Sequence, residues 1–260
     1  MMGRPRWWIV VAVALTQLVV ATAVLGFRWV TSSTEVPVTE AVERFREGAP
    51  RVAAEPAEPE PTDGAASPTQ PTTGVYRFTT SGSESAAGVD RALPDRSVRL
   101  VTREDATRWT VRHEYSAEHT EWFALGVDER GLFAELYRLK VTFGPFTVDE
   151  TVEFEPTVRL AVFPFEVDQR WTGGFEGGSF TGRTFEHTTM SVGDEILEVW
   201  GIEVAIDLDG EIEGTLRTQI WYSPRHAMPV KESYAQDLRV GRGTYQGSWT
   251  ITMLSTVPER

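Results

Sequence analysis

Apolar and polar residues alternate along most of the chain, from Val75 to Val257. Successive side chains of a β-strand point to opposite faces, so a period of two predicts strands with one packed face and one face in water. The last run is the clearest, since Tyr245, Trp249 and Met253 alternate with threonine, serine and glutamine residues. The other runs of this kind cover 75–81, 97–103, 108–115, 119–127, 132–143, 147–155, 158–163, 180–192, 200–208, 212–222 and 228–240.

Short turn signals separate these runs. Asp209-Gly210, between two alternating runs, is the strongest short hairpin signal in the chain. Many strands with short turns and no crossover helices predict an antiparallel sheet. We therefore expect one all-β domain over 75–257 whose apolar face curls over a second layer, a helix or a ligand. Two packed β-halves meeting near residue 165 are the alternative.

The N-terminal stretch from Trp7 to Val30 is apolar and contains no acidic residue. At about 1.5 Å per residue, a helix from Trp7 to Phe27 spans roughly the 30 Å hydrocarbon core of a bilayer. The sequence therefore predicts one transmembrane helix in residues 1–30, acting as a signal anchor. Arg4 and Arg6 precede it, so the positive-inside rule places the N-terminus in the cytoplasm and the β-domain outside.

A cleaved signal peptide is the alternative interpretation of this stretch. Ala21-Thr22-Ala23 fits the small-x-small pattern of a cleavage site, but the apolar run continues to Phe27. In either case the β-domain lies outside the cytoplasm. With the anchor retained, the expected location is the cytoplasmic membrane, crossed once.

Residues 31–74 separate the predicted anchor from the β-domain. A short helix is expected at 35–48, where Thr39 can cap the start and Gly48 can end it. Because an isolated helix this short is marginal in water, we expect it to be transient, with a docking segment as the alternative. The proline- and glutamate-rich segment 49–73 predicts a disordered, extended spacer that lifts the domain off the membrane.

Net charge and cysteine content exclude several classes of partner. The net charge of −13 argues against nucleic acid, which rewards basic surfaces. The chain has no cysteine, so neither a disulfide nor an acylated cysteine can hold it in place. The domain must be stabilised by burial alone, which its size permits.

Two segments resemble parts of known proteins. The segment 163–171, FPFEVDQRW, is similar to an aromatic-Pro-aliphatic step before Trp in uncharacterised secreted bacterial β-domains, and 221–232, WYSPRHAMPVKE, is similar to a late hairpin of the same group. The opening at 74–84 resembles that of membrane-anchored actinobacterial proteins of unknown role. These domains resemble half-barrel lipoprotein carriers of the LolA and LppX/LprG type.

The resemblance implies a curved antiparallel half-barrel or flattened barrel whose concave, apolar side accepts an acyl chain. This chain lacks the acylated cysteine of those carriers, which argues against a shuttling role. Within such a barrel, aromatic residues are the candidates for an apolar ligand-binding lining, although core packing explains them equally. The candidates are Trp109, Trp200, Tyr222 and Trp249.

The glycine-rich stretch 173–182 is the candidate for a mobile rim loop over the mouth of the barrel. Its residues Gly174, Phe175, Gly178 and Phe180 would form the flap. The stretch fits neither a phosphate-binding loop nor a GxSxG nucleophile elbow, because it has no lysine and lacks the second glycine.

No motif in the chain predicts catalysis, a metal or a cofactor. Facing strands could bring His113, His119 and Glu121 together, but the spacing does not match a known zinc motif. A hydrolase would need His113, Glu121 and a hydroxyl group to converge in a cavity. The leading hypothesis is therefore a membrane-anchored extracytoplasmic β-domain of the cell envelope that binds a hydrophobic or lipid ligand. The alternative is a non-catalytic scaffold for an envelope protein partner.

Overall fold

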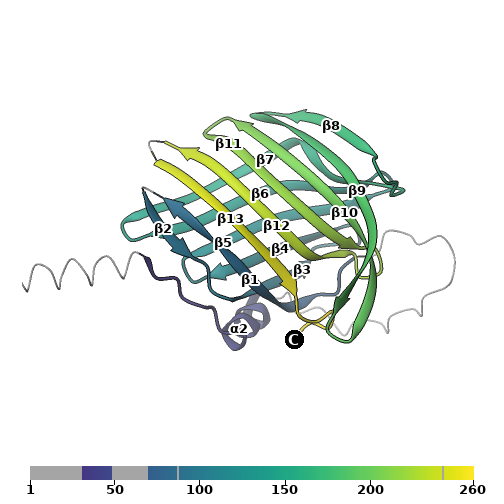
Figure 1. The fold of residues 1–260 in the computed structure, drawn as a ribbon, viewed down its shortest axis with the longest axis horizontal. Helices are drawn as coiled ribbons and strands as arrows, with labels where there is room; N and C mark the ends of the chain where they lie inside the picture. The colour runs from purple at the N-terminus through teal and green to yellow at the C-terminus, as the bar shows by residue number, and fades with distance from the viewer. Residues whose placement is uncertain (1–30, 49–69, 87, 242) are drawn as a thin grey trace, which may run out of the picture.

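The computed structural model describes residues 31–48, 70–86, 88–241 and 243–260. Within these residues, thirteen strands form one antiparallel sheet (Figure 1). The strands are β1 Gly74–Ala86, β2 Val89–Ala92, β3 Arg96–Arg103, β4 Arg108–Ser116, β5 His119–Asp128, β6 Gly131–Phe143, β7 Phe146–Val162, β8 Arg170–Phe175, β9 Gly178–Val192, β10 Glu195–Asp209, β11 Ile212–Ser223, β12 Met228–Val240 and β13 Gly243–Met253. The predicted all-β antiparallel fold is confirmed.

The sheet curls into a nearly closed barrel, so of the two forms that the resemblance implied, a barrel and not an open half-barrel is observed. The strands follow the order β7-β6-β5-β4-β3-β1-β13-β12-β11-β10-β9-β8, with β2 added beside β1. β1 pairs with β13, so the first and last strands of the domain are neighbours. At the remaining seam, Glu176 N donates to Glu155 O at 2.8 Å and Trp171 Nε1 donates to Arg159 O at 2.8 Å. These bonds join β7 to the β8–β9 hairpin across the seam.

Because neighbouring strands run in opposite directions, the turns gather at two ends of the barrel. The turns after β4, β6, β8 and β10 lie at one end, which we call the β4–β5 end. The turns after β3, β5, β9 and β11 lie at the other, which we call the β5–β6 end. The interior is filled by the packed faces of the strands, as the alternation predicts, and Tyr245, Ile251 and Met253 of the clearest run are each at most 2% exposed.

The glycine-rich stretch forms a hairpin, so the prediction of a rim loop is wrong. Gly174 and Phe175 belong to β8, Gly178 and Phe180 belong to β9, and both phenylalanines are buried. The glycines of this hairpin provide space for aromatic rings. A Cβ atom added to Gly173 would lie 2.4 Å from the Phe180 ring across the strand pair. Gly182 is covered in the same way by Trp171, its partner in the ladder.

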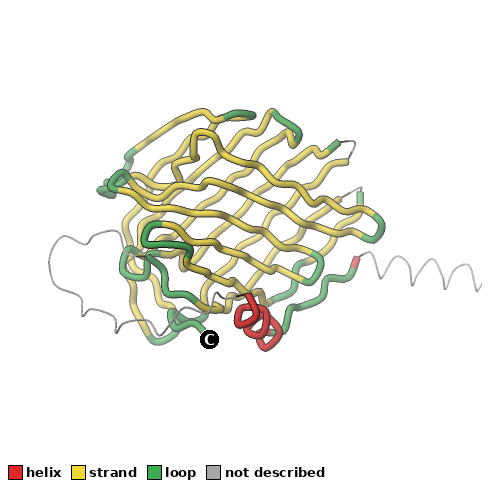
Figure 2. Tube along the Cα trace, turned by 180° about the vertical axis from the view of Figure 1, so that it is seen from behind, coloured by secondary structure: helices red, strands yellow, loops and turns green. Residues whose placement is uncertain are grey.

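The helix α2, Val38–Gly48, packs on the outside of the barrel and is not an isolated, transient segment (Figure 2). Ala41 and Val42 are buried against Val75, Val98 and Leu100 of β1 and β3. A second contact is ionic, because the guanidinium of Arg44 bonds to the carboxylate of Glu114 on β4. Packing against the barrel supplies the stability that a helix of this length lacks alone.

The residues before α2 are also bonded to the barrel. Ser33 Oγ donates to Ala92 O at 2.6 Å, and Ala117 N donates to Thr34 O at 2.8 Å. On the other side of the proline-rich segment, Gln70 Nε2 donates to Asp105 O at 2.9 Å. The segment 49–69, which lies outside the described residues, therefore connects two points of the same domain. A spacer that lifts the domain off a membrane would have to precede Ser33, so that part of the prediction is wrong.

The predicted membrane anchor at 1–30 also falls outside the described residues and stays a prediction. In the part of the chain that the structure describes, no helix combines the length and the apolar character needed to cross a bilayer.

Candidate binding chamber

A cavity of about 90 Å³, which we call the chamber, lies inside the barrel. Most of its wall is apolar and comes from both halves of the sheet. On the first half the wall includes Val101, Trp109, Val111, Leu125, Leu132 and Leu160, and on the second half it includes Val204, Ile206, Leu216, Ile220 and Met228. A protein interior is normally close-packed, so an unfilled apolar space of this size is a candidate ligand site.

The chamber lies toward the β5–β6 end of the barrel. Trp109 and Met228 stand at the beginnings of β4 and β12, and Tyr222 stands near the end of β11, which are all positions at that end. Pro71 is buried there and also lines the chamber. Its neighbours are fixed, because Gln70 bonds to Asp105 and Tyr76 Oη donates to Thr72 O at 2.7 Å. The segment immediately before β1 therefore covers part of the chamber.

Two of the four predicted lining residues border the chamber, and two do not. Trp109 and Tyr222 are in its wall. Trp249 is buried, but it packs against Tyr115 and Tyr234, with ring centroids 5.1 and 5.4 Å away. Trp200 is half-buried and stacks on His187 at 4.2 Å and on Phe165 at 5.3 Å. The predicted lining role is therefore wrong for Trp249 and Trp200, whose ring faces are already covered by other side chains.

Polar side chains form one side of the chamber, which we call the floor. It consists of Arg99, His113, Tyr137, Glu232, Tyr234 and Gln236. Arg99 forms an ion pair with Glu232, and Tyr234 Oη donates to the other oxygen of that carboxylate at 2.8 Å. Gln236 Nε2 donates to Glu121 Oε1 at 2.6 Å. The floor is thus a hydrogen-bonded layer in the middle of the barrel.

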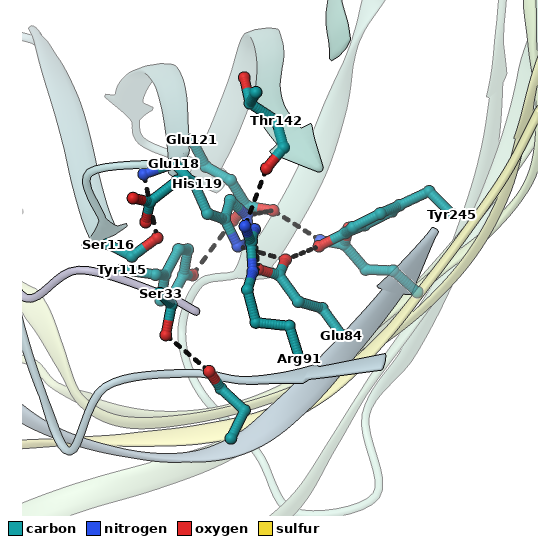
Figure 3. Close-up of polar contacts among 12 residues, drawn as sticks. Ser33, Glu84, Arg91, Tyr115, Ser116, Glu118, His119, Glu121, Thr142 and Tyr245 are labelled. Atoms are coloured by element: carbon teal, nitrogen blue, oxygen red, sulfur yellow. Dashed lines mark hydrogen bonds and ion pairs between the residues drawn. The ribbon is translucent and has the colours of Figure 1, made fainter. Parts of the chain in front are cut away.

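Beyond the floor, toward the β4–β5 end, lies a buried ionic cluster (Figure 3). It consists of Glu84, Arg91, His119 and Glu121, each at most 2% exposed. Arg91 donates to Glu84 Oε1 from Nε at 3.0 Å and from Nη2 at 2.5 Å. His119 Nδ1 lies 2.9 Å from Glu84 Oε2 and its Nε2 lies 3.8 Å from Glu121 Oε1. Each charge in the cluster therefore has a partner of opposite sign.

Tyrosine hydroxyls complete the contacts of the two carboxylates. Tyr245 Oη donates to Glu84 at 2.9 Å, and Glu121 accepts from Tyr115 at 3.1 Å and from Tyr137 at 2.8 Å. Burial raises the pKa of each of these tyrosines well above its ordinary value, and the neighbouring glutamates add to that effect. The hydroxyls therefore stay protonated and act as donors.

The ion pair between Glu84 and His119 keeps both groups charged. Burial by itself would raise the pKa of Glu84, but the charges of His119 and Arg91 lower it to about 2. Burial would likewise lower the pKa of His119, but the carboxylates of Glu84 and Glu121 raise it to about 9. Both shifts favour the charged forms at neutral pH.

His113 and Glu121 lie in paired positions of β4 and β5, but the contacts of His113 differ from those of a serine hydrolase histidine. His113 Nε2 is 2.9 Å from Ser97 Oγ, while Arg99 Nε donates to His113 Nδ1 at 3.1 Å. In a serine hydrolase that second nitrogen would face a carboxylate. Burial and the charge of Arg99 lower the pKa of His113 well below its ordinary value, so the ring is a poor proton acceptor. The described residues also contain no group of histidine and acidic side chains placed to hold a metal ion.

The sequence predicted that His113, His119 and Glu121 could lie together, as they do. It did not predict the other residues of the floor and the cluster, although a signal was present. On β12, Glu232 and Gln236 fall in phase with the buried residues Val230, Tyr234 and Leu238. On a strand with one buried face, a charged residue in phase with the apolar residues points inward and needs a hydrogen-bond or ion-pair partner there. The alternation identifies such positions but gives no pairing between strands far apart in the sequence.

No protein-family model, curated protein or solved structure matches this chain. The functional argument therefore rests on the chamber, the floor and the ionic cluster.

Proposed function

We propose that the domain binds a small, predominantly apolar molecule in the chamber. The observation that carries this proposal is the unfilled apolar space inside a barrel whose other interior residues are buried and packed. An empty cavity destabilises a protein, so a ligand that fills it also stabilises the fold. Residues of the predicted lining, Trp109 and Tyr222, are part of its wall.

The size of the chamber restricts the ligand class. A water molecule needs about 10 to 15 Å³ of such space, so 90 Å³ has room for on the order of six to nine waters. A ligand with a similar number of non-hydrogen atoms fits, whereas a diacyl lipid does not. The hydrophobic ligand expected from the sequence is thus a small one, such as a single medium-length chain.

The membrane-anchored, extracytoplasmic location is a further part of this proposal. It is supported by the sequence of Trp7–Val30 and by the arginines before it. Because Ser33 and Thr34 bond to Ala92 and Ala117, the anchor would hold the β4–β5 end of the barrel close to the bilayer. The chamber, at the opposite end, would then face away from the membrane.

Methionine methyl groups provide a direct test of binding. The chain has five methionines, of which Met228 lines the chamber while Met190 and Met253 do not. We expect 1-octanol, added to the purified full-length chain labelled with ¹³C at the methionine methyls, to shift the Met228 resonance in a saturable way. The resonances of Met190 and Met253 should stay in place.

A pair of variants on one strand provides the control. Thr218 lines the chamber, whereas its neighbour Gln219 is exposed. Thr218→Phe should fill the space and abolish the Met228 shift, and Gln219→Phe should leave it unchanged. If Met228 in the unaltered protein does not respond to octanol, the binding function is rejected, and a structural role as an envelope scaffold becomes the better hypothesis.

A further inference from the structure

The first half of β7 has a strand partner on one side only. β7 contains 17 residues and β8 contains six, and no described strand forms a ladder with β7 on the side that faces β8. The seam bonds from the β8–β9 hairpin reach β7 at Glu155 and Arg159, in its second half. We call the unpaired side of residues 146–153 the free edge.

The backbone of the free edge directs hydrogen-bonding groups outward at every second residue. Thr142 on β6 pairs with Thr147, yet its N–H donates to Glu118 O, on the other side of β6, at 2.8 Å. Thr142 and Thr147 therefore form a non-hydrogen-bonded pair, whose backbone groups point away from each other. With a period of two, four exposed residues direct their N–H and C=O groups outward. They are Thr147, Asp149, Thr151 and Glu153.

The features that protect a sheet edge lie beyond this stretch. The ladder between β6 and β7 is regular from Phe146 to Glu153, and its register shift and Pro156 follow only after Glu153. Bulges and prolines discourage a sheet edge from pairing with another chain, whereas a regular edge can accept an added strand. The stretch from Thr147 to Glu153 is about 20 Å long, at roughly 3.3 Å per residue.

Acidic side chains along the free edge favour one kind of partner. They are those of Asp149, Glu150 and Glu153, and only Asp149 has ion-pair partners among the described residues, Arg138 and Lys140 of β6. Opposite charges directly across a strand pair stabilise it, and like charges destabilise it. A strand with basic side chains therefore fits this edge.

A second copy of this chain fits the free edge poorly. In the antiparallel register that pairs all four outward residues, the two copies of Glu150 lie opposite each other. A shift of two residues in either direction places Asp149 opposite Glu153 or opposite its own copy. Each of these registers opposes like charges, which disfavours self-pairing.

We propose that the free edge of β7 binds an extended, basic segment of another protein as an added antiparallel strand. The backbone groups of the four outward residues supply the hydrogen bonds, and Asp149 and Glu153 select basic side chains opposite them. The proposal is independent of ligand binding, because no residue of the free edge lines the chamber.

A capped nine-residue peptide in which lysine and valine alternate tests the proposal on the purified full-length chain. Amide hydrogen exchange, followed by NMR at pH 7, resolves single residues. We expect saturating peptide to slow exchange of the four outward amides about tenfold or more, while the amides at 148, 150 and 152, already bonded to β6, change little. A glutamate–valine peptide should bind about fivefold or more weakly, and methylation of the lysine amide nitrogens should abolish the protection.

Two variants separate backbone pairing from charge. Thr151→Pro removes one outward N–H that the ladder with β6 does not use, and it should weaken binding of the lysine peptide about tenfold or more. Thr151→Val, the matched control, keeps that N–H and should bind as the unaltered protein does. Glu153→Lys should weaken binding about two- to fivefold, and it provides a second test if Thr151→Pro does not fold. Isothermal titration calorimetry measures each dissociation constant.

Three results would overturn the proposal. The first is unchanged exchange of the outward amides in the unaltered protein with the lysine peptide present. The second is equal binding of the lysine and glutamate peptides. The third is protection of the outward amides that grows with protein concentration in the absence of peptide, which would assign the free edge to a second copy of the chain.

Discussion

The two ends of the barrel interior differ in composition and in packing: one contains buried ion pairs and the other an apolar cavity. At the β4–β5 end, Glu84, Arg91 and His119 form a compact set of buried ion pairs. At the β5–β6 end, apolar side chains from β3 to β7 and from β10 to β12 leave the chamber between them. Under the proposed function, one continuous sheet separates two roles, because its strands are held together at one end and leave room for a ligand at the other.

The ionic cluster joins strands that are distant in the sequence. Tyr245 on β13 donates to Glu84 on β1, 161 residues earlier, and Arg91 on β2 reaches the carbonyl of Thr142 near the end of β6 at 2.8 Å. The cluster therefore connects the first and last strands of the domain with its middle. The polar floor also carries cross-links, from Arg99 to Glu232 and from Gln236 to Glu121, whereas the described side chains of the apolar wall form no ion pair. Changes in the cluster and in the apolar wall should therefore have different consequences for stability and for binding.

The largest expected effect comes from breaking the Arg91–Glu84 pair. Arg91→Met leaves the Glu84 carboxylate buried with fewer partners, and such a loss costs about 3 to 5 kcal/mol. Leu216→Met, a volume-conserving change in the chamber wall, should cost less than about 1.5 kcal/mol. Urea unfolding of the full-length chain, followed by tryptophan fluorescence, measures both.

The control for this comparison is Arg183→Met, which breaks the exposed pair with Glu203. A surface pair contributes about 0 to 1 kcal/mol. If Arg91→Met were no more destabilising than Arg183→Met, the cluster would not be the structural part of the interior, and the contrast between the two ends would fail.

The second prediction concerns pH. His119 has an ordinary pKa of 6.5 and a pKa of about 9 in the folded protein, so its contribution is complete below pH 6.5 and is lost as the pH rises through 9. Glu84 shifts from 4.5 to about 2, so its contribution is complete above pH 4.5 and is lost as the pH falls through 2. The free energy of unfolding should therefore be highest between about pH 4.5 and 6.5.

The variant His119→Gln separates this effect from other titrations. It should lower stability at pH 6 and remove most of the decline between pH 6.5 and 9, as measured by urea unfolding at each pH. A decline of unchanged steepness in His119→Gln would assign the alkaline loss to another group.

The third prediction compares leucine-to-alanine changes away from the chamber and in its wall. Leu139 is fully buried on β6, in a ladder position opposite Glu121, whereas Leu216 borders the chamber. Leu-to-alanine changes in cores cost about 2 to 5 kcal/mol, depending on how many packing contacts are lost. Leu139→Ala should fall near the upper value and Leu216→Ala near the lower one, because Leu216 already faces empty space on one side.

Octanol gives this comparison a second readout. Saturating octanol should restore part of the stability lost in Leu216→Ala and should leave the deficit of Leu139→Ala unchanged relative to the unaltered protein. Equal costs for the two truncations would indicate that the chamber is closely packed in solution.

The strands could be predicted from the sequence because one face of each meets water. The run ending at Met253 has the polar-apolar alternation that this arrangement requires, and it folds as β13. The hairpin of β8 and β9 was missed because its glycines suggest flexibility. Gly173 and Gly182 are instead required for space beside Phe180 and Trp171, and a ladder pairing is not visible in the sequence.

The chamber could be predicted only in part for a related reason. Trp109 and Trp249 both fall at inward positions by their alternation, yet one faces open space and the other faces Tyr115 and Tyr234. Which inward residue meets a cavity depends on side chains across the barrel. The closure of the sheet could not be predicted either. Glu176 and Trp171 bond to residues of β7 across the seam, and nothing in the local sequence indicates these pairings.

The smallest expected effect concerns α2, which packs on the outside of the barrel. Val42→Ala removes buried methyl groups from the contact with β1 and β3, worth roughly 1 to 1.5 kcal/mol. If α2 opens independently of the barrel, its amides should exchange with deuterium about tenfold faster, while the amides of β12 and β13 stay unchanged. Glu43→Ala, at an exposed position of the same helix, is the control and should change neither. Faster exchange in the strands as well would mean that α2 and the barrel unfold together, so that the segment 33–48 is an integral part of the domain and fixes how the barrel lies relative to whatever precedes it.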